Sequence, residues 1–116
     1  QRHDYRLEVA LHNAGAAVFG SYHVDLELPT AVLTGTSGRV EDRSNRDTSL
    51  FRMRWSGPAD DVFPGDTKRV FDIPYFMDET LYHRRGLFDL LVCATLYEGG
   101  HRRVHVEGRF EAFQNF

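Results

Sequence analysis

The sequence is poor in cysteine, in long apolar runs and in basic charge, and each shortage narrows what the protein can be. Cys93 is the single cysteine among 116 residues, so no disulfide can form within the chain. A lone thiol fits a reducing compartment, and we expect the cytoplasm rather than an oxidising environment. No apolar run approaches the ~20 residues of a membrane span. The net charge of −3 argues against a nucleic-acid partner, which requires a concentrated basic face.

Motifs for catalysis and for nucleotide binding are also missing. The chain contains no G-x-S-x-G, Walker-type or G-x-G-x-x-G sequence. Cys93 lies in the apolar stretch LFDLLVCATLY, where no neighbour in the sequence would activate it, so we interpret it as a packed thiol rather than a nucleophile. We therefore expect no enzymatic activity and no cofactor.

Six histidines raise the question of a metal site. His12 and His23 fall on the outward faces of the first two expected strands, where they could oppose each other and bind zinc together with Asp25. Polar residues also face each other across sheets for solubility alone. His101 and His105 share one face of a strand but would lie ~13 Å apart along it. We predict no metal site.

The sequence does contain a nearly continuous alternation of apolar and polar residues with a period of two. Tyr5, Leu7 and Val9 alternate with polar or charged residues, as expected for a half-buried strand. The same alternation recurs, between turn-rich stretches, in segments 22–28, 51–55, 63–76, 87–97 and 103–113. Residues 30–48 have no clear period, and we interpret them as a long connection with one weak edge strand at 39–42.

Helical patterns are scarce, which decides the fold class. Only residues 76–86 could form a helix, whereas an α/β fold needs helical stretches of ten or more residues between its strands. We predict an all-β fold, an antiparallel immunoglobulin-like β-sandwich of six to eight strands. Residues 1–116 should form a single domain. No signal peptide is in view, and the chain could be a domain cut from a longer protein.

Two prolines accompany the strand expected within FPGDTKRVFDIPYF, residues 63–76. Pro64 precedes Gly65 and should lie in the turn before the strand. Pro74 cannot donate a ladder hydrogen bond, so we place it near the end of the strand, on an edge or where pairing has stopped. Phe71 and Ile73 share one parity and should point inward.

The parity of the last two segments predicts the hairpin between them. Even-numbered residues are apolar in both segments, and residues that oppose each other in a hairpin share a face. A two-residue turn at Gly99 and Gly100 would pair even with odd numbers and turn one regular strand inside out. We therefore predict a three-residue loop around 99–101, with Leu96 and Val104 both buried. The predicted core consists of Leu7, Val9, Val24, Leu26, Trp55, Ile73, Leu90, Val92, Val104 and Val106.

The outer side of segment 87–97 is less polar than its expected neighbours. It carries Leu91, Cys93 and Tyr97, and a strand that is apolar on both faces normally has both faces covered. If segment 51–55 is the other neighbour, charged or polar side chains flank this stripe, namely Arg52, Arg54, His105 and Arg109. Either the long side chains lie over the stripe, or these seven residues form a docking face. We adopt the docking face as the working hypothesis.

Aromatic residues near strand ends suggest a different class of function. Tyr75, Phe76 and Tyr82 could form a flat platform on which a sugar stacks. The alternative is that these rings cap the open ends of the core, where they bury large areas.

Two short motifs resemble known modules. Pro64, Gly65 and Asp66 form a PG-[DE] turn before a strand that ends in proline, which resembles the later half of bacterial immunoglobulin-like or fibronectin-type-III-like sandwiches. The sequence HNAG at 12–15 resembles the N-x-G turn of a cell-adhesion-related domain found in bacteria. Such domains are generally non-catalytic modules attached to other domains, so the resemblance implies an accessory role here.

We therefore expect an interaction module that docks a protein partner, or a neighbouring domain of the same chain, through its outer sheet face. Weak homo-oligomerisation is a further expectation. A carbohydrate-binding module is the alternative function.

Overall fold

The computed structural model describes residues 2–34, 40–42, 47–83, 86 and 89–110. Its strands are β1 (Arg2–His12), β2 (Tyr22–Pro29), β3 (Thr48–Trp55), β4 (Thr67–Asp78), β5 (Leu91–Glu98) and β6 (His101–Arg109). Two 3-10 turns, η1 (Thr30–Val32) and η2 (Pro58–Asp60), and the one-turn helix α1 (Glu79–Tyr82) lie between them. Within these ranges no helix has the length and apolar character that a membrane span demands.

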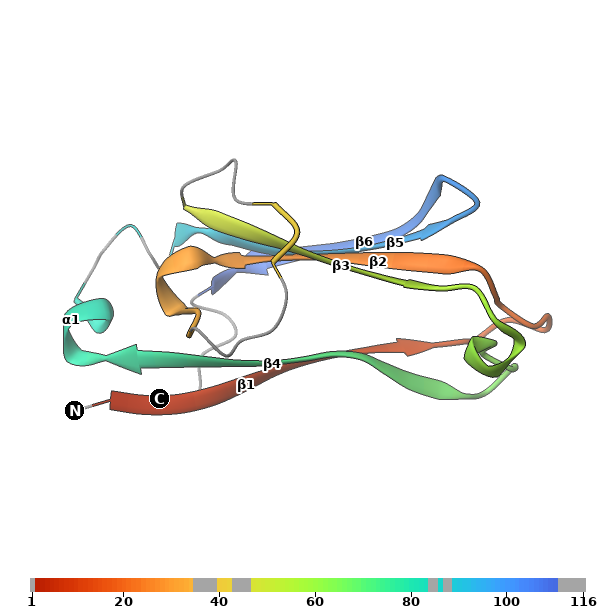
Figure 1. Cartoon of the computed structure of the whole chain (residues 1–116), viewed down its shortest axis with the longest axis horizontal. Coiled ribbons are helices and arrows are strands. Elements are labelled where there is room, and N and C mark those ends of the chain that lie inside the picture. The colour runs from red at the N-terminus through yellow and green to blue at the C-terminus, as the bar shows by residue number, and fades with distance from the viewer. Residues whose placement is uncertain (1, 35–39, 43–46, 84–85, 87–88, 111–116) are drawn as a thin grey trace.

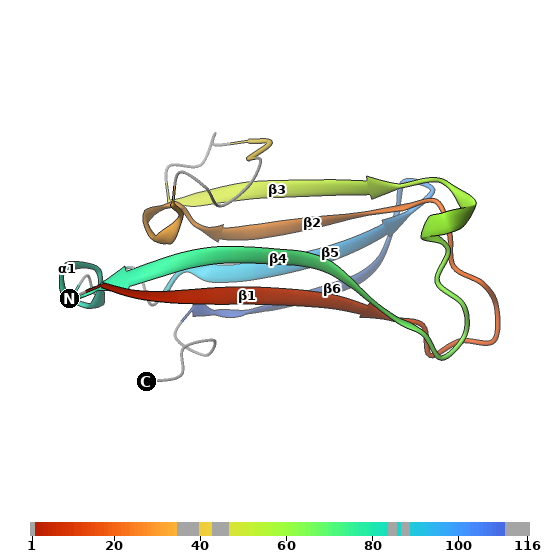
Figure 2. The same ribbon diagram turned by 60° about the horizontal axis from the view of Figure 1, so that its bottom comes forward.

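The strands form two antiparallel sheets that lie in two layers (Figure 1). One sheet contains only β1 and β4, and the other has the strand order β3-β2-β5-β6. The prediction of an antiparallel all-β fold is confirmed. The unequal width of the two sheets, visible in Figure 2, determines which apolar residues are covered.

The core lies between the sheets, and the alternation of each strand selects its members. Along β2, alternate residues from Tyr22 to Leu28 are buried, while the residues between them are partly or fully exposed. Buried residues of β4 face them, among them Phe71, Ile73 and Tyr75. Because side chains in a strand point to opposite faces in turn, this alternation gives each sheet one inner and one outer face.

Strand β4 carries Pro74 in its interior rather than near its end, since the strand continues to Asp78. The predicted position at the strand end was wrong, but the edge location holds. β4 has a continuous ladder only with β1, and on its other side the described residues add a single bridge between Tyr75 and Leu33. A strand with one open side tolerates proline. Phe71 and Ile73 are buried, as predicted.

A bulge in β4 explains why two consecutive residues are buried there. The register shifts between Val9 and Ala10 of β1, which pair with Phe71 and Arg69 and leave Val70 as the extra residue. Val70 and Phe71 are 5% and 3% exposed. Successive side chains of a regular strand point to opposite faces, but the extra residue of a bulge allows two neighbouring side chains to point to the same face.

The hairpin between β5 and β6 satisfies the parity requirement in a different way from the one predicted. Its turn has two residues, Gly99 and Gly100, both with positive φ, and the predicted three-residue loop was wrong. The register shifts beyond Tyr97, which pairs with Arg102, so that Leu96 pairs with Val104 and Arg103 is the extra residue. The bulge thus returns the apolar residues of both strands to the same face.

The predicted core is confirmed in part. Val24, Leu26, Ile73 and Val92 are buried. Four others are partly buried, namely Leu7, Val9, Trp55 and Leu90. Val104 and Val106 were predicted wrongly, because β6 is the edge strand of the wider sheet, and they are 51% and 58% exposed.

The expected strand at 39–42 is reduced to an isolated bridge between Asp42 and Leu50, and residue 39 lies outside the described residues. The expected strands at 87–97 and 103–113 are shorter in the structure, where β5 begins at Leu91 and β6 ends at Arg109. Residues 87–88 and 111–113 lie outside the described residues.

Candidate functional site

The outer face of the four-stranded sheet, which points away from β1 and β4, gathers the residues of the predicted docking face. The residues that pair across the strands form rows on this face. One row runs from Arg54 through His23 to Tyr97, and the next runs from Arg52 through Asp25 and Thr95 to His105. Cys93 follows between Glu27 and Glu107, and Leu91 pairs with Arg109.

The strand order corrects two expectations about this face. β3 is not the neighbour of β5, because β2 lies between them and places His23 and Asp25 between the arginines and the apolar stripe. His12 does not oppose His23, since β1 and β2 belong to different sheets. The zinc set that these two histidines could have formed with Asp25 is therefore not assembled.

Side-chain pairs cover much of the face. Arg52 donates from two nitrogens to the two carboxylate oxygens of Asp25, at 2.6 and 2.7 Å. The His23 ring stacks on Tyr97 with 4.5 Å between centroids and 12° between planes. Of the predicted apolar stripe, Leu91 is 45% exposed, whereas Cys93 and Tyr97 are only partly exposed. Leu91 is therefore the most exposed residue of the predicted stripe.

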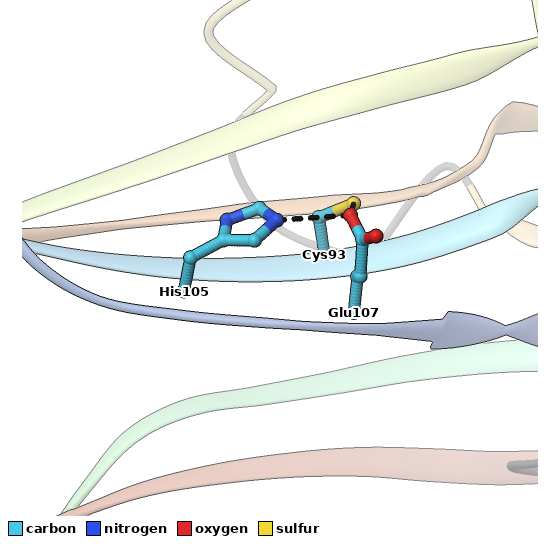
Figure 3. A group of neighbouring side chains, drawn as sticks. All are labelled: Cys93, His105 and Glu107. Atoms are coloured by element: carbon cyan, nitrogen blue, oxygen red, sulfur yellow. Dashed lines mark hydrogen bonds and ion pairs between the residues drawn. The ribbon is translucent and has the colours of Figure 1, made fainter.

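At the centre of the β5–β6 pair, Cys93, His105 and Glu107 lie side by side (Figure 3). His105 Nε2 is 3.0 Å from Glu107 Oε2, and the Cys93 thiol donates to the same oxygen at 3.9 Å. His105 Nδ1 lies 2.7 Å from the hydroxyl of Thr95, a residue that is 7% exposed. The cluster therefore contains a thiol, an imidazole and a carboxylate whose ligand atoms converge.

Electrostatics keep the metal-free Cys93 thiol protonated. Burial raises its pKa, and the nearby carboxylates of Glu27 and Glu107 raise it further. A raised pKa makes the thiol a poor nucleophile. A dication placed among these groups would reverse that effect, because a coordinating thiol is deprotonated by the metal.

Sequence reasoning found Cys93 and His105 but assigned no role to Thr95 or Glu107. The signal was present in the spacing His105-x-Glu107, which puts both side chains on one face of a strand. A hairpin whose paired numbers sum to an even value allows Cys93 to oppose Glu107, and the structure has that pair.

A second feature lies on the opposite, inner side of the same hairpin. Val104 and Val106 face inward yet remain exposed. They line an apolar groove of about 220 Å³ with residues of β1, β2, β4 and β5, among them Val9, Leu11, Val24, Val70 and Leu96. Strands β1 and β6, which both contribute to the lining, lie on the same side of the molecule (Figure 2).

Of the aromatic residues named as a sugar platform, Tyr75 is buried and Phe76 is partly buried. Tyr75 is 4% exposed, stacks on Tyr5 at 5.3 Å and meets Phe110 edge-on at 5.9 Å, so it belongs to the core. Phe76 is partly buried against the same core. The Tyr82 side chain lies outside the described part of the structure.

Comparison of the chain with protein-family models, with curated proteins and with solved structures finds no match. The interpretation of both features therefore depends on their geometry and chemistry.

Proposed function

We propose that the chain is a non-catalytic interaction module with an immunoglobulin-like strand arrangement, and that it binds an extended segment of a protein partner in the groove between β1 and β6. The arrangement is supported by the chain path. The β2–β3 and β5–β6 pairs share one sheet, and the chain changes sheet between β1 and β2, β3 and β4, and β4 and β5. Crossovers of this kind are common in immunoglobulin-like sandwiches.

The observation that carries the proposal is the exposure of Val104 and Val106. Both side chains lie on the inner face of the four-stranded sheet, opposite Leu96 and Ala94. Leu96 is 8% exposed, whereas the two valines are more than half exposed. Inward-facing valines that remain in solvent are apolar surface that a partner can bury.

The geometry favours a strand as the occupant. Neighbouring strands lie about 4.7–4.9 Å apart, so a two-stranded layer covers only part of a four-stranded one. Among the described residues, β1 has a ladder only with β4 and β6 only with β5. An added strand could pair with the free edge of β1 and cover Val104 and Val106 with every second side chain.

The lining of the groove defines the chemistry of that segment. Val9 and Leu11 of β1 and Val104 and Val106 of β6 all present branched apolar side chains at alternate positions. The occupant should therefore be an extended peptide with β-branched residues at alternate positions.

The test uses a short synthetic peptide in which valine alternates with threonine, with a glutamate at each end for solubility. We expect this peptide to shift the backbone amide NMR signals of β1 and β6 and to slow hydrogen exchange along β1. Val106→Glu places an unpaired charge in the groove and should weaken binding at least about tenfold. The fold should be retained, because exposed sites tolerate polar substitution.

Leu91→Glu is the matched control, since Leu91 is an exposed apolar residue of the same hairpin on the outer face. It should leave peptide binding unchanged. If Leu91→Glu abolishes binding and Val106→Glu does not, the outer docking face is the binding surface and the groove assignment fails. Absence of any amide shift in the groove overturns the proposal. Self-association of the free chain that Val106→Glu abolishes would identify a second copy as the occupant instead.

A further inference from the structure

We propose that Cys93, His105 and Glu107 form a zinc site on the outer face of the β5–β6 pair, with a fourth position open to water or to an exogenous ligand. The site lies on the face opposite the groove. It therefore stands independently of the proposed interaction function, and either proposal can fail without the other.

The register of the sheet assembles the three residues. Cys93 and Glu107 are direct cross-strand partners, and His105 precedes Glu107 by two positions on β6. Residues two apart in a strand point to the same face, and residues in a cross-strand pair share a face. The cluster is thus a consequence of backbone pairing and does not depend on the placement of a loop.

The distances suit zinc. All three ligand atoms lie within 4.8 Å of one another, with 3.0 Å between His105 Nε2 and Glu107 Oε2 and 3.9 Å between Cys93 Sγ and Glu107 Oε2. Tetrahedral zinc with bonds of about 2.0–2.3 Å places its ligand atoms about 3.3–3.8 Å apart. Small side-chain rotations would therefore complete the coordination without any movement of the strands.

Thr95 supplies a neighbour that orients the imidazole. Its hydroxyl lies 2.7 Å from His105 Nδ1, and the nearly buried threonine leaves Nε2 directed at the cluster. A zinc-bound imidazole must be neutral, with its proton on the other nitrogen. In that tautomer Nδ1–H donates to Thr95 Oγ1, an arrangement that metal-binding histidines commonly show.

The total charge and the softness of the three ligand groups determine which metal ion the site should prefer. A thiolate, a carboxylate and a neutral imidazole carry two negative charges together and balance one dication. Thiolate and imidazole favour zinc over magnesium or calcium, which prefer oxygen ligands. Binding would release the thiol proton of Cys93, so the affinity for zinc should increase with pH.

The test is a calorimetric titration of the reduced, metal-free chain with Zn²⁺, together with the optical spectrum of its Co²⁺ form. We expect one ion per chain and a thiolate-to-cobalt charge-transfer band. Cys93→Ser should abolish that band, and Cys93→Ser, His105→Gln and Glu107→Gln should each weaken zinc binding at least about tenfold. Thermal melts of the metal-free variants will establish that each of them folds.

Two comparisons between variants distinguish zinc coordination by these residues from a general effect of charge. His101→Gln removes an exposed histidine of the same strand that lies outside the cluster, and it should leave the affinity unchanged. Thr95→Val should weaken binding while Thr95→Ser restores it, because only the hydroxyl orients His105. Failure of the folded wild-type chain to bind zinc overturns the proposal. Binding that survives Cys93→Ser with its cobalt band intact overturns it as well.

Discussion

Single residues of the outer face are held by side-chain pairs that cross between strands. Asp25 and Arg52 form a two-bond ion pair, and Thr95 holds one nitrogen of His105. Parity in the sequence predicted the face to which Arg52 and His105 belong. It could not predict their partners, because a partner is determined by which strand lies alongside, and that depends on contacts distant in the sequence.

His23 is the residue of this face whose ionisation should affect stability. Burial lowers its pKa below 6.5; the Asp25 carboxylate opposes this shift, and the positive charges of Arg52 and Arg54 add to it. A lowered pKa means that the unfolded chain binds more protons than the folded chain near and below pH 6.5. Stability should therefore fall as the pH falls through that range.

We expect His23→Phe, which keeps an aromatic ring against Tyr97, to lose less stability than the wild type between about pH 7.5 and about pH 5.5. Urea unfolding at both pH values measures the difference. His101→Gln is the control, because His101 is exposed at the start of β6. An identical pH dependence in wild type and His23→Phe would show that the environment of His23 is unimportant for stability.

At the scale of strands and turns, the β5–β6 hairpin combines a two-residue turn with a bulge. Gly99 and Gly100 have φ values of 56° and 80°, in the left-handed region that glycine adopts readily. The extra residue, Arg103, then restores the parity that the turn would otherwise reverse. The parity of the apolar residues showed that a two-residue turn between regular strands could not keep both apolar faces inward. It did not show whether an extra residue in the loop or a bulge in a strand would resolve the conflict. Both solutions satisfy the same constraint on faces.

Gly100→Ala should destabilise the protein by about 1–2 kcal/mol, because a side chain disfavours the left-handed conformation. A Cβ there would meet nothing within 4 Å, so the cost is conformational rather than steric. Gly57→Ala is the control, since Gly57 has a φ of −91° and room for a Cβ. It should change the free energy of unfolding by less than about 0.5 kcal/mol. Equal effects of the two substitutions in urea unfolding would contradict the turn assignment.

At the scale of the whole molecule, the two sheets share one core, but the narrow sheet covers only part of the wide sheet. Residues at the centre of the wide sheet, such as Leu26, are fully buried against the narrow sheet. Its outermost strands extend beyond that cover, which leaves Met53 on one side and Val104 and Val106 on the other exposed. The exposed side near β6 is the groove to which the interaction function is assigned.

Leu26→Ala should therefore lower the free energy of unfolding by about 2–5 kcal/mol, because the substitution opens a cavity between the sheets. Val104→Ala, on the same inner face but half exposed, should cost clearly less. Trp55 fluorescence and far-UV circular dichroism should report the same unfolding midpoint if the two sheets unfold together. A loss below about 1 kcal/mol in Leu26→Ala would show that Leu26 is not at the centre of the core.

The sequence by itself determined the faces of the six strands and the approximate position of each strand in the chain. The period of two is a local property, so the inward positions of Val24, Leu26, Phe71 and Ile73 could be read from their neighbours alone. The same parity placed the seven residues of the predicted docking face on one side of their strands. Local alternation carries no information about how many strands each layer contains.

The tertiary structure alone decided the order of the strands, and with it the two candidate sites. β2 rather than β3 became the neighbour of β5, which paired His23 with Tyr97. The narrow β1–β4 sheet left Val104 and Val106 uncovered, although their alternation is that of buried residues. The physical reason is that burial and side-chain contacts depend on which surfaces meet, and surfaces meet through pairings between distant segments. Cys93, His105 and Glu107 converge by that same mechanism.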